Sequence, residues 1–160
     1  MIIYHGGTDI VDKPRIIQQY MGRDFGVGFY TTSIQEQAIK WAIRQARYRK
    51  KEEAILNTYE LDDNAFTVLN VKTFDEYAID WLDFILSCRQ NPDFKHEYDI
   101  IIGKVANDDI GETVQAVVDG LTSKEFALNK LKFMFANDQI CFSTDDALTY
   151  LKFISSKRVN

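Results

Sequence analysis

The chain has 160 residues, of which 46% are hydrophobic and 13% aromatic, and its formal net charge is −5 at pH 7. This length and composition predict one globular domain over residues 1–160 and exclude a disordered chain. The acidic balance argues against general nucleic-acid binding, and the lack of a long apolar window or a secretory leader predicts a soluble cytoplasmic protein without membrane contact.

The first half of the chain predicts strands around one long helix. β-Branched and aromatic residues at 2–4, followed by two glycines, are typical of a short strand, and a second strand is expected within the glycine-rich stretch 26–32. A helix follows over 33–51, opened by a capping box of Ser33 with Glu36 and with Trp41 facing inward. The next two strands, at 54–61 and 65–71, are expected to pair as a hairpin.

The second half predicts more helices. A capping box of Thr73 with Glu76 opens a helix whose apolar face includes Trp81. The remaining expected elements, in chain order, are a buried strand within 98–105, helices at about 110–119 and 123–134, a last strand at 138–144 and a closing helix at 144–154. This irregular alternation predicts an α+β fold with a mostly antiparallel sheet.

Common site motifs are missing from the sequence. Gly26 and Gly28 lack the third glycine of a dinucleotide fingerprint, and the two cysteines and two histidines share no metal-ligand spacing, so no metal is expected. What remains is His5 at the edge of the first strand, Tyr30 at the end of the second and Gln139 on a late strand. Taken alone, the pattern predicts that Gly26 and Gly28 form a hairpin turn. Tyr30 would then be a core residue and His5 a hydrogen-bonded histidine at the edge of its strand.

Four longer blocks change this interpretation: "YHGG", "DFGVGFYTT", "YDIIIGKVANDD" and "NDQICF". In this order they resemble the ADP-ribosyltransferase superfamily, and more narrowly a small bacterial family of such domains with uncharacterised function. The resemblance spans nearly the whole chain. It implies a split sheet, with two small mostly antiparallel sheets that form an NAD cleft and carry flanking helices.

The resemblance also implies roles for individual residues, with NAD as a substrate. The implied catalytic residues are His5, Tyr30 and Gln139. A neutral His5 imidazole can hydrogen-bond a ribose hydroxyl, and the Tyr30 ring can stack on nicotinamide. The implied NAD-binding residues are His5, Gly6, Asp24, Phe25, Gly28, Tyr30 and Thr31.

Position 139 departs from the pattern of the superfamily. Active members usually place a glutamate there, which opposes the positive charge that develops on the ribose, and Gln139 carries no charge. Asp24, Asp108 and Asp109 are the carboxylates that could substitute. Asn107, Asp108 and Asp109 form either an auxiliary or substrate site or a helix N-cap, and both roles can hold together.

The resemblance leads to two main hypotheses about function. The first is an NAD-dependent ADP-ribosyltransferase or NAD glycohydrolase, acting as a bacterial toxin or effector on an unidentified protein or nucleic acid, with a small antitoxin-like partner. The second is a catalytically silent module that keeps the fold and binds NAD, another nucleotide or a protein. A nucleic-acid enzyme with His5 as general base is a third and weaker alternative.

Overall fold

The chain folds into two small β-sheets with flanking helices, in a computed structural model that describes residues 1–18, 23–91, 93–106, 108–131 and 137–159. The first sheet, sheet A, is antiparallel and has the strand order β1-β3-β7. Its strands are β1 (Ile2–Gly7), β3 (Ala54–Leu61) and β7 (Leu151–Val159). The sequence therefore predicted the α+β class correctly, and the antiparallel strands of this sheet are confirmed.

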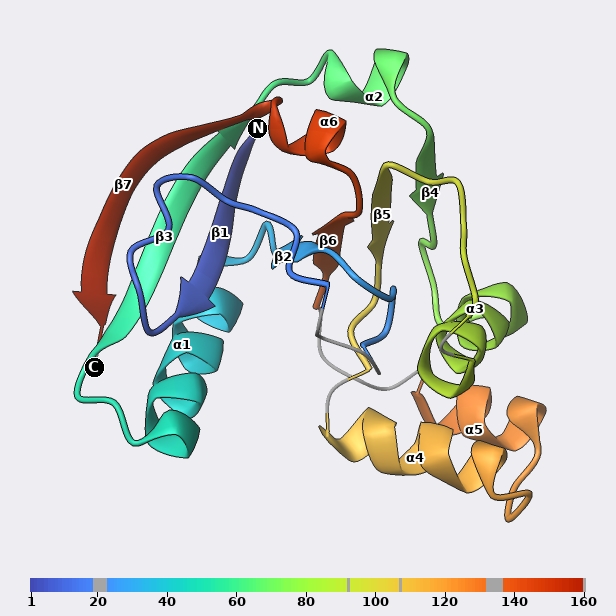
Figure 1. The fold of residues 1–160 in the computed structure, drawn as a ribbon. Coiled ribbons are helices and arrows are strands. Elements are labelled where there is room, and N and C mark those ends of the chain that lie inside the picture. Colours follow the sequence, from blue (N-terminus) through green and yellow to red (C-terminus); the bar gives the residue numbers. More distant parts are fainter. Residues whose placement is uncertain (19–22, 92, 107, 132–136, 160) are drawn as a thin grey trace.

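The second sheet, sheet B, has the strand order β2-β6-β5-β4. Its strands are β2 (Phe29–Thr31), β6 (Gln139–Phe142), β5 (Ile100–Gly103) and β4 (Val71–Thr73). Neighbouring strands run antiparallel except β4 and β5, which are parallel. Figure 1 shows the two sheets beside each other, with helix α1 next to sheet A and helices α3, α4 and α5 next to sheet B.

Among the described residues, an isolated backbone bridge joins the two sheets. Tyr4 of β1 pairs with Thr32, just after β2, through N–H···O distances of 2.8 Å and 2.9 Å. His5 follows Tyr4 on β1, and Tyr30 lies on β2, two residues before Thr32. We call this place the split, and it is defined by Tyr4, His5, Tyr30 and Thr32.

Helix α1 (Gln35–Arg49) packs on sheet A through small residues. Ala38, Ala42 and Ala46 are buried, and a Cβ at Gly6 would lie 2.0 Å from the Ala38 carbonyl oxygen. The lack of a side chain at residue 6 thus allows the helix to approach the strand closely. The expectation that Trp41 faces inward is wrong, since it is 49% exposed.

The start of α1 is held by Asp138 and not by the expected capping box. The helix begins after Ile34, and its N-cap residue makes no side-chain cap hydrogen bond. Instead the Asp138 carboxylate accepts from the Ser33 backbone N–H at 3.0 Å and from the hydroxyls of Ser33 and Thr32. A distant acidic residue therefore supplies the capping that local sequence was expected to provide.

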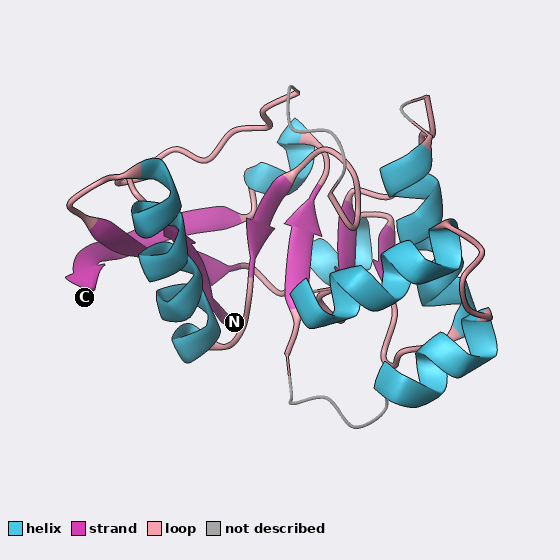
Figure 2. Cartoon of the chain, turned by 90° about the horizontal axis from the view of Figure 1, so that it is seen from below, coloured by secondary structure: helices cyan, strands magenta, loops and turns pink. Residues whose placement is uncertain are grey.

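Sheet B has a hydrophobic core on each face. One core lies under helices α3 (Ile79–Gln90), α4 (Asp108–Val118) and α5 (Lys124–Leu131) and includes Trp81 and Cys141. The other lies toward sheet A and includes Phe29, Tyr59 and Phe142. Figure 2, seen from below, shows these three helices on the opposite side of the molecule from α1, which lies near the C-terminus.

Three predicted elements are wrong. The segment 65–71 forms a short helix α2 (Ala65–Val68) before β4, because the turn at 62–64 continues into helical hydrogen bonds. Its hairpin with β3 does not exist, since β3 and β4 belong to different sheets. The closing helix ends early as α6 (Asp145–Leu148), capped by Thr144, and the chain continues as β7.

The capping box at Thr73 is also wrong, because this residue ends β4 and the helix begins only at Ile79. The predicted helices on both sides of Gly120 are confirmed, and Gly120 has a φ of 69°, as a helix-ending glycine does. Within the described ranges, no helix combines the length and apolar character that a membrane crossing requires.

Candidate functional site

His5 lies at the split with one ring nitrogen fixed. Its Nδ1 is 2.7 Å from the Tyr30 carbonyl oxygen, and its ring stacks on the Phe29 ring with centroids 4.6 Å apart. A carbonyl oxygen can only accept, so Nδ1 carries the proton. The imidazole is therefore held in one tautomer and one orientation by β2.

The other ring nitrogen of His5 is an open acceptor. Nε2 has no hydrogen-bond partner among the described residues, and it is not completely buried. A Cβ at Gly7 would lie 3.3 Å from Nε2, and the glycine leaves this space clear. Burial lowers the pKa of His5 below 6.5, with a smaller effect of Arg23, so the imidazole is neutral at pH 7.

Tyr30 closes the glycine loop that precedes β2. Its hydroxyl donates to the Gly26 carbonyl at 2.7 Å and accepts from the Phe25 N–H at 3.1 Å. Gly26 adopts a φ of 77°, which a glycine reaches without strain. Burial raises the pKa of Tyr30 well above its usual value, so the hydroxyl stays protonated.

The Tyr30 ring also has a cationic neighbour. The Arg23 guanidinium carbon lies 5.0 Å from the ring centroid, a cation–π geometry. The hydroxyl of Tyr30 is thus committed to the loop, and the aromatic ring is the part that faces a charged group. A stacking role for Tyr30 would use the ring and leave the hydroxyl in place.

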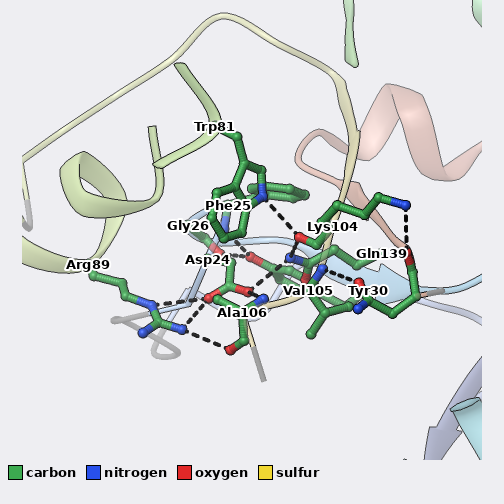
Figure 3. A network of polar contacts seen from close by, with 11 residues as sticks. Asp24, Phe25, Gly26, Tyr30, Trp81, Arg89, Lys104, Val105, Ala106 and Gln139 are labelled. Carbon is green, nitrogen blue, oxygen red and sulfur yellow. Dashed lines mark hydrogen bonds and ion pairs between the residues drawn. The ribbon is translucent and has the colours of Figure 1, made fainter. Parts of the chain in front are cut away.

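Gln139 belongs to a buried polar network with Asp24 (Figure 3). Its Nε2 donates to Asp24 Oδ2 at 2.9 Å and to the Lys104 carbonyl at 3.0 Å. Both partners are acceptors, which fixes Nε2 as the donor. The structure thus brings together two of the predicted site residues, Asp24 and Gln139, which lie 115 positions apart.

Arg89 of helix α3 completes this network, and no sequence pattern singled it out. Its guanidinium forms a salt bridge with Asp24, with Nε 3.1 Å from Oδ1 and Nη2 on the same oxygen. The Ala106 N–H donates to Asp24 Oδ2 at 2.8 Å. Asp24 therefore accepts four hydrogen bonds from three segments of the chain.

His5 and Gln139 contact different faces of sheet B. Tyr30 pairs with Cys141, so the side chains of Tyr30, Cys141 and Gln139 share one face, because paired residues and alternate residues of strands do so. Phe29, on which His5 stacks, points to the other face. The three predicted catalytic residues are linked through the Tyr30 backbone and do not gather as three facing side chains.

The other predicted NAD-binding residues support the fold around the split. Gly6 is covered by helix α1, and Phe25 is fully buried. A Cβ at Gly28 would lie 2.4 Å from Cys141 Sγ, so this glycine lets β2 approach β6. Thr31 is buried and donates to the Ile140 carbonyl at 3.2 Å.

The "ANDD" block lies largely outside what the structure describes. Asn107 is not among the described residues, and of Asp108 and Asp109 only their place at the start of α4 is described. Their predicted auxiliary role therefore stays a prediction. In the described ranges, no three His, Cys, Asp or Glu side chains gather in a way that could hold a metal ion.

Asn137 and Asp138, next to Gln139, make structural contacts that the sequence did not indicate. Asn137 accepts from the Val105 N–H at 2.8 Å and donates to the Tyr77 hydroxyl at 2.8 Å. Asp138 also contacts Gln37 through its backbone carbonyl, 2.6 Å from Gln37 Nε2. Three consecutive residues thus contact four other segments of the chain, and only their tertiary partners reveal this.

The comparisons with known proteins identify the family. A family model described as "Protein of unknown function (DUF3990)" matches residues 1–153. The chain belongs to this family. A search of curated proteins and a search of solved structures found no match to the chain. The function of this DUF3990 domain is therefore argued from its own residues.

Proposed function

We propose that this DUF3990 domain binds NAD at the split between its sheets and cleaves the bond between nicotinamide and ribose, as an ADP-ribosyltransferase or NAD glycohydrolase. The proposal rests on the geometry of His5, a neutral imidazole whose Nδ1 is fixed by the Tyr30 carbonyl and whose Nε2 has no hydrogen-bond partner among the described residues. Nε2 can accept a hydrogen bond from a ribose hydroxyl and orient the sugar. The four sequence blocks and the split sheet agree with this proposal.

The reaction needs orientation and charge more than a nucleophilic side chain. The bond between ribose C1′ and the nicotinamide nitrogen breaks, and its electron pair leaves with nicotinamide. A hydroxyl, amine or water then bonds to C1′ and loses a proton. At the split, His5 would hold the ribose through Nε2. Stacking of nicotinamide on the Tyr30 ring stays a prediction, because that ring lies on the other face of sheet B from the Phe29 ring on which His5 stacks.

The proposal includes two kinds of acceptor for ADP-ribose, one for each reaction. A protein or a nucleic acid would receive ADP-ribose in a transferase, and water would receive it in a glycohydrolase. A toxin or effector role with a small antitoxin-like protein partner is proposed on the resemblance of the sequence blocks. A fold alone does not determine such a biological role, so this role is proposed from the sequence blocks.

A catalytically silent nucleotide-binding module is the second candidate, and the Gln139 network favours it. The amide nitrogen of Gln139 is committed to Asp24 and Lys104, and the side chain has no charge to oppose a developing cation. Such a module would bind NAD or ADP-ribose through His5 and release no nicotinamide.

Thermal denaturation with and without NAD tests the binding part. A ligand that binds the folded state alone stabilises it by about 2.7 kcal/mol at a hundredfold excess over Kd, so we expect NAD to raise the Tm. His5→Ala should lose the shift, and Gly7→Ala should reduce it by crowding Nε2 while keeping the imidazole. Mass spectrometry of free nicotinamide then separates the enzyme from the silent module.

His96→Gln is the matched control, because His96 is the other histidine of the chain and its ring packs against Phe84, Phe94 and Tyr98 instead of Phe29. Its ring is held by the Phe25 carbonyl and the Tyr98 N–H. We expect it to keep the NAD shift. No shift of the wild type at millimolar NAD, or equal losses in the His5 and His96 variants, would contradict the proposal.

A further inference from the structure

We propose that the exposed face of helix α1 is a docking surface for a short acidic segment of another protein. The surface is defined by Lys40, Trp41, Arg44, Arg47 and Tyr48, and we call it the α1 surface. The inference goes beyond the proposed function, because it needs neither NAD nor the split. Figure 1 shows α1 beside sheet A, away from the helices next to sheet B.

Helix α1 buries its small side chains and exposes its largest ones. Ala38, Ala42 and Ala46 are buried against sheet A, whereas Trp41 is 49% and Tyr48 84% exposed. A helix of a globular protein normally does the reverse, because burial of large apolar side chains stabilises the fold. Trp41 and Tyr48 are seven residues apart, so two turns of helix place both rings on one side. Such a pair of exposed rings is typical of a binding surface.

Positive charge accompanies the two rings along the helix. Residues 40–51 contain no acidic residue and six basic ones, which are Lys40, Arg44, Arg47, Arg49, Lys50 and Lys51. The first three are exposed, and their spacing of four and three residues aligns them in a stripe next to the rings. Lys40 and Arg47 form no salt bridge with another described residue. Their charges therefore remain for a partner to neutralise.

The helix dipole explains only part of this charge. Cations in the last turn of a helix offset its negative pole, which accounts for Arg47 and Arg49. This effect is confined to the last turn, so it does not account for Lys40 and Arg44. Arg44 instead lies over the Trp41 ring, with its guanidinium carbon 5.6 Å from the ring centroid. The contact holds an aromatic ring and a positive charge side by side on the exposed face.

The charge of the α1 surface determines which partner fits it. Because the chain has a net charge of −5 and residues 40–51 contribute +6, the rest of the chain carries −11. The surface is thus a positive area on an acidic molecule, and it attracts acidic groups. A second copy of the chain related by a two-fold axis would bring two positive surfaces together, so it is not the expected occupant.

A short protein segment fits the α1 surface better than a nucleic acid does. Tryptophan, tyrosine and arginine are the residue types that contribute most to binding at protein interfaces, and they make up most of this surface. A nucleic acid can also stack on aromatic rings and contact cations. However, the stretch from Lys40 to Arg49 is only about 14 Å long, and the acidic remainder of the chain repels a polyanion that extends beyond it.

Selection from a phage library of random peptides against the whole chain tests the kind of partner. We expect the selected peptides to be enriched in Asp and Glu and to contain large apolar residues that pack on the two rings. A single strand of oligodeoxythymidine is the nucleic-acid probe, and we expect it to bind more weakly than the selected peptides. Selected peptides without acidic enrichment, or tighter binding of the oligonucleotide, would overturn the proposal.

Two double variants test the residues, with binding rates of a selected acidic peptide measured by surface plasmon resonance. W41A/Y48A should weaken binding at least about tenfold, mainly by faster dissociation, because it removes the aromatic anchors. K40E/R47E should slow association and reduce its dependence on salt, because surface charges steer the encounter. Urea denaturation should show little change for W41A/Y48A, since both rings are exposed and alanine favours a helix.

F126A/K130E in helix α5 is the matched control, because it removes an exposed aromatic ring and reverses a charge one turn away on another helix. We expect it to bind the peptide as the wild type does. Equal loss in this control, or no loss in either α1 variant, would overturn the proposal. Self-association of the wild type that W41A/Y48A abolishes, seen by sedimentation, would assign the surface to a second copy and overturn it as well. The effect of NAD on Tm should be the same in all these variants, so either proposal can fail alone.

Discussion

The two polar regions beside sheet B are built in opposite ways. At the split, His5 is neutral and makes one hydrogen bond, and its second nitrogen is open. Around Asp24, both carboxylate oxygens accept two bonds each, and a buried ion pair balances the charge. The first arrangement leaves bonding capacity for a ligand, and the second uses it to join three segments of the chain.

Because of this difference, we expect ligand binding and the stability of the fold to depend on different residues. A side chain with an unused acceptor can be removed with little loss to the fold, whereas a buried carboxylate with four donors cannot. Variants in the two regions should therefore divide into those that change ligand binding and those that change the free energy of unfolding. Gln139 belongs to the second region, because its amide nitrogen donates to Asp24 and to the Lys104 carbonyl.

Asp24→Ala should have the largest effect on stability. It leaves the Arg89 guanidinium, the Ala106 N–H and the Gln139 amide without their acceptor, and breaking a buried ion pair in this way costs about 3–5 kcal/mol. Urea denaturation measures the loss. Asp83→Ala, which breaks the exposed pair with Lys124, is the control and should cost less than about 1 kcal/mol. Similar losses in both would contradict the distinction between the regions.

Gly28→Ala should have an intermediate effect. The new Cβ would lie 2.4 Å from Cys141 Sγ and 2.8 Å from the Phe142 carbonyl oxygen, and overpacking of this kind costs about 1–3 kcal/mol. Gly111→Ala in helix α4 is the matched control, because its nearest neighbour would be 4.0 Å away and alanine favours helices. Thermal denaturation of both should show a lower Tm for the first and an unchanged or higher Tm for the second.

The smallest expected effect is the change in the free energy of unfolding that the two histidines cause as the pH falls. Burial lowers the pKa of His5 and of His96 below 6.5, so below pH 6.5 the unfolded chain binds protons that the folded chain resists. The free energy of unfolding should therefore fall as pH drops from 6.5 toward 5. His5→Gln and His96→Gln should each flatten this dependence. Wild-type stability that rises over the same range would show that the imidazoles are not kept neutral.

Local patterns predicted most strands and the longer helices. Alternation in 54–61 and the apolar run in 98–105 correspond to β3 and β5, whose burial the pattern reflects directly. The segment 144–154 was predicted wrongly because its apolar residues fit a helical period as well as a strand. Pairing with β3 decides between them, as Leu151 and Phe153 take their places opposite Leu61 and Tyr59.

The site could be predicted only in part. The sequence blocks indicated His5, Tyr30, Asp24 and Gln139, since each lies in a distinctive short motif. Arg89 lies in an ordinary helical pattern, and its role depends on where α3 packs. Asn57 is similar, being fully buried within β3 with its amide bound to the Val11 N–H at 2.9 Å. Such partners arise from tertiary contacts, which no local pattern contains.

The two histidines make the central claim directly measurable. His5 carries its proton on Nδ1, which faces the Tyr30 carbonyl. His96 accepts from the Tyr98 N–H at Nδ1, 3.3 Å away, and its Nε2 faces the Phe25 carbonyl at 3.4 Å, so it carries its proton on Nε2. Opposite tautomers give distinct nitrogen chemical shifts, and the chain has no third histidine.

Nitrogen-15 NMR of the imidazoles at pH 7, recorded during a titration with NAD, therefore tests the account most directly. We predict one neutral ring protonated on Nδ1, assigned to His5 by its loss in His5→Gln, whose Nε2 signal moves as NAD is added. The signals of the second ring, His96, should stay in place. A protonated His5, a His5 ring with its proton on Nε2, or a His5 signal that NAD leaves unmoved would contradict the proposal that His5 is the ligand-binding group at the split.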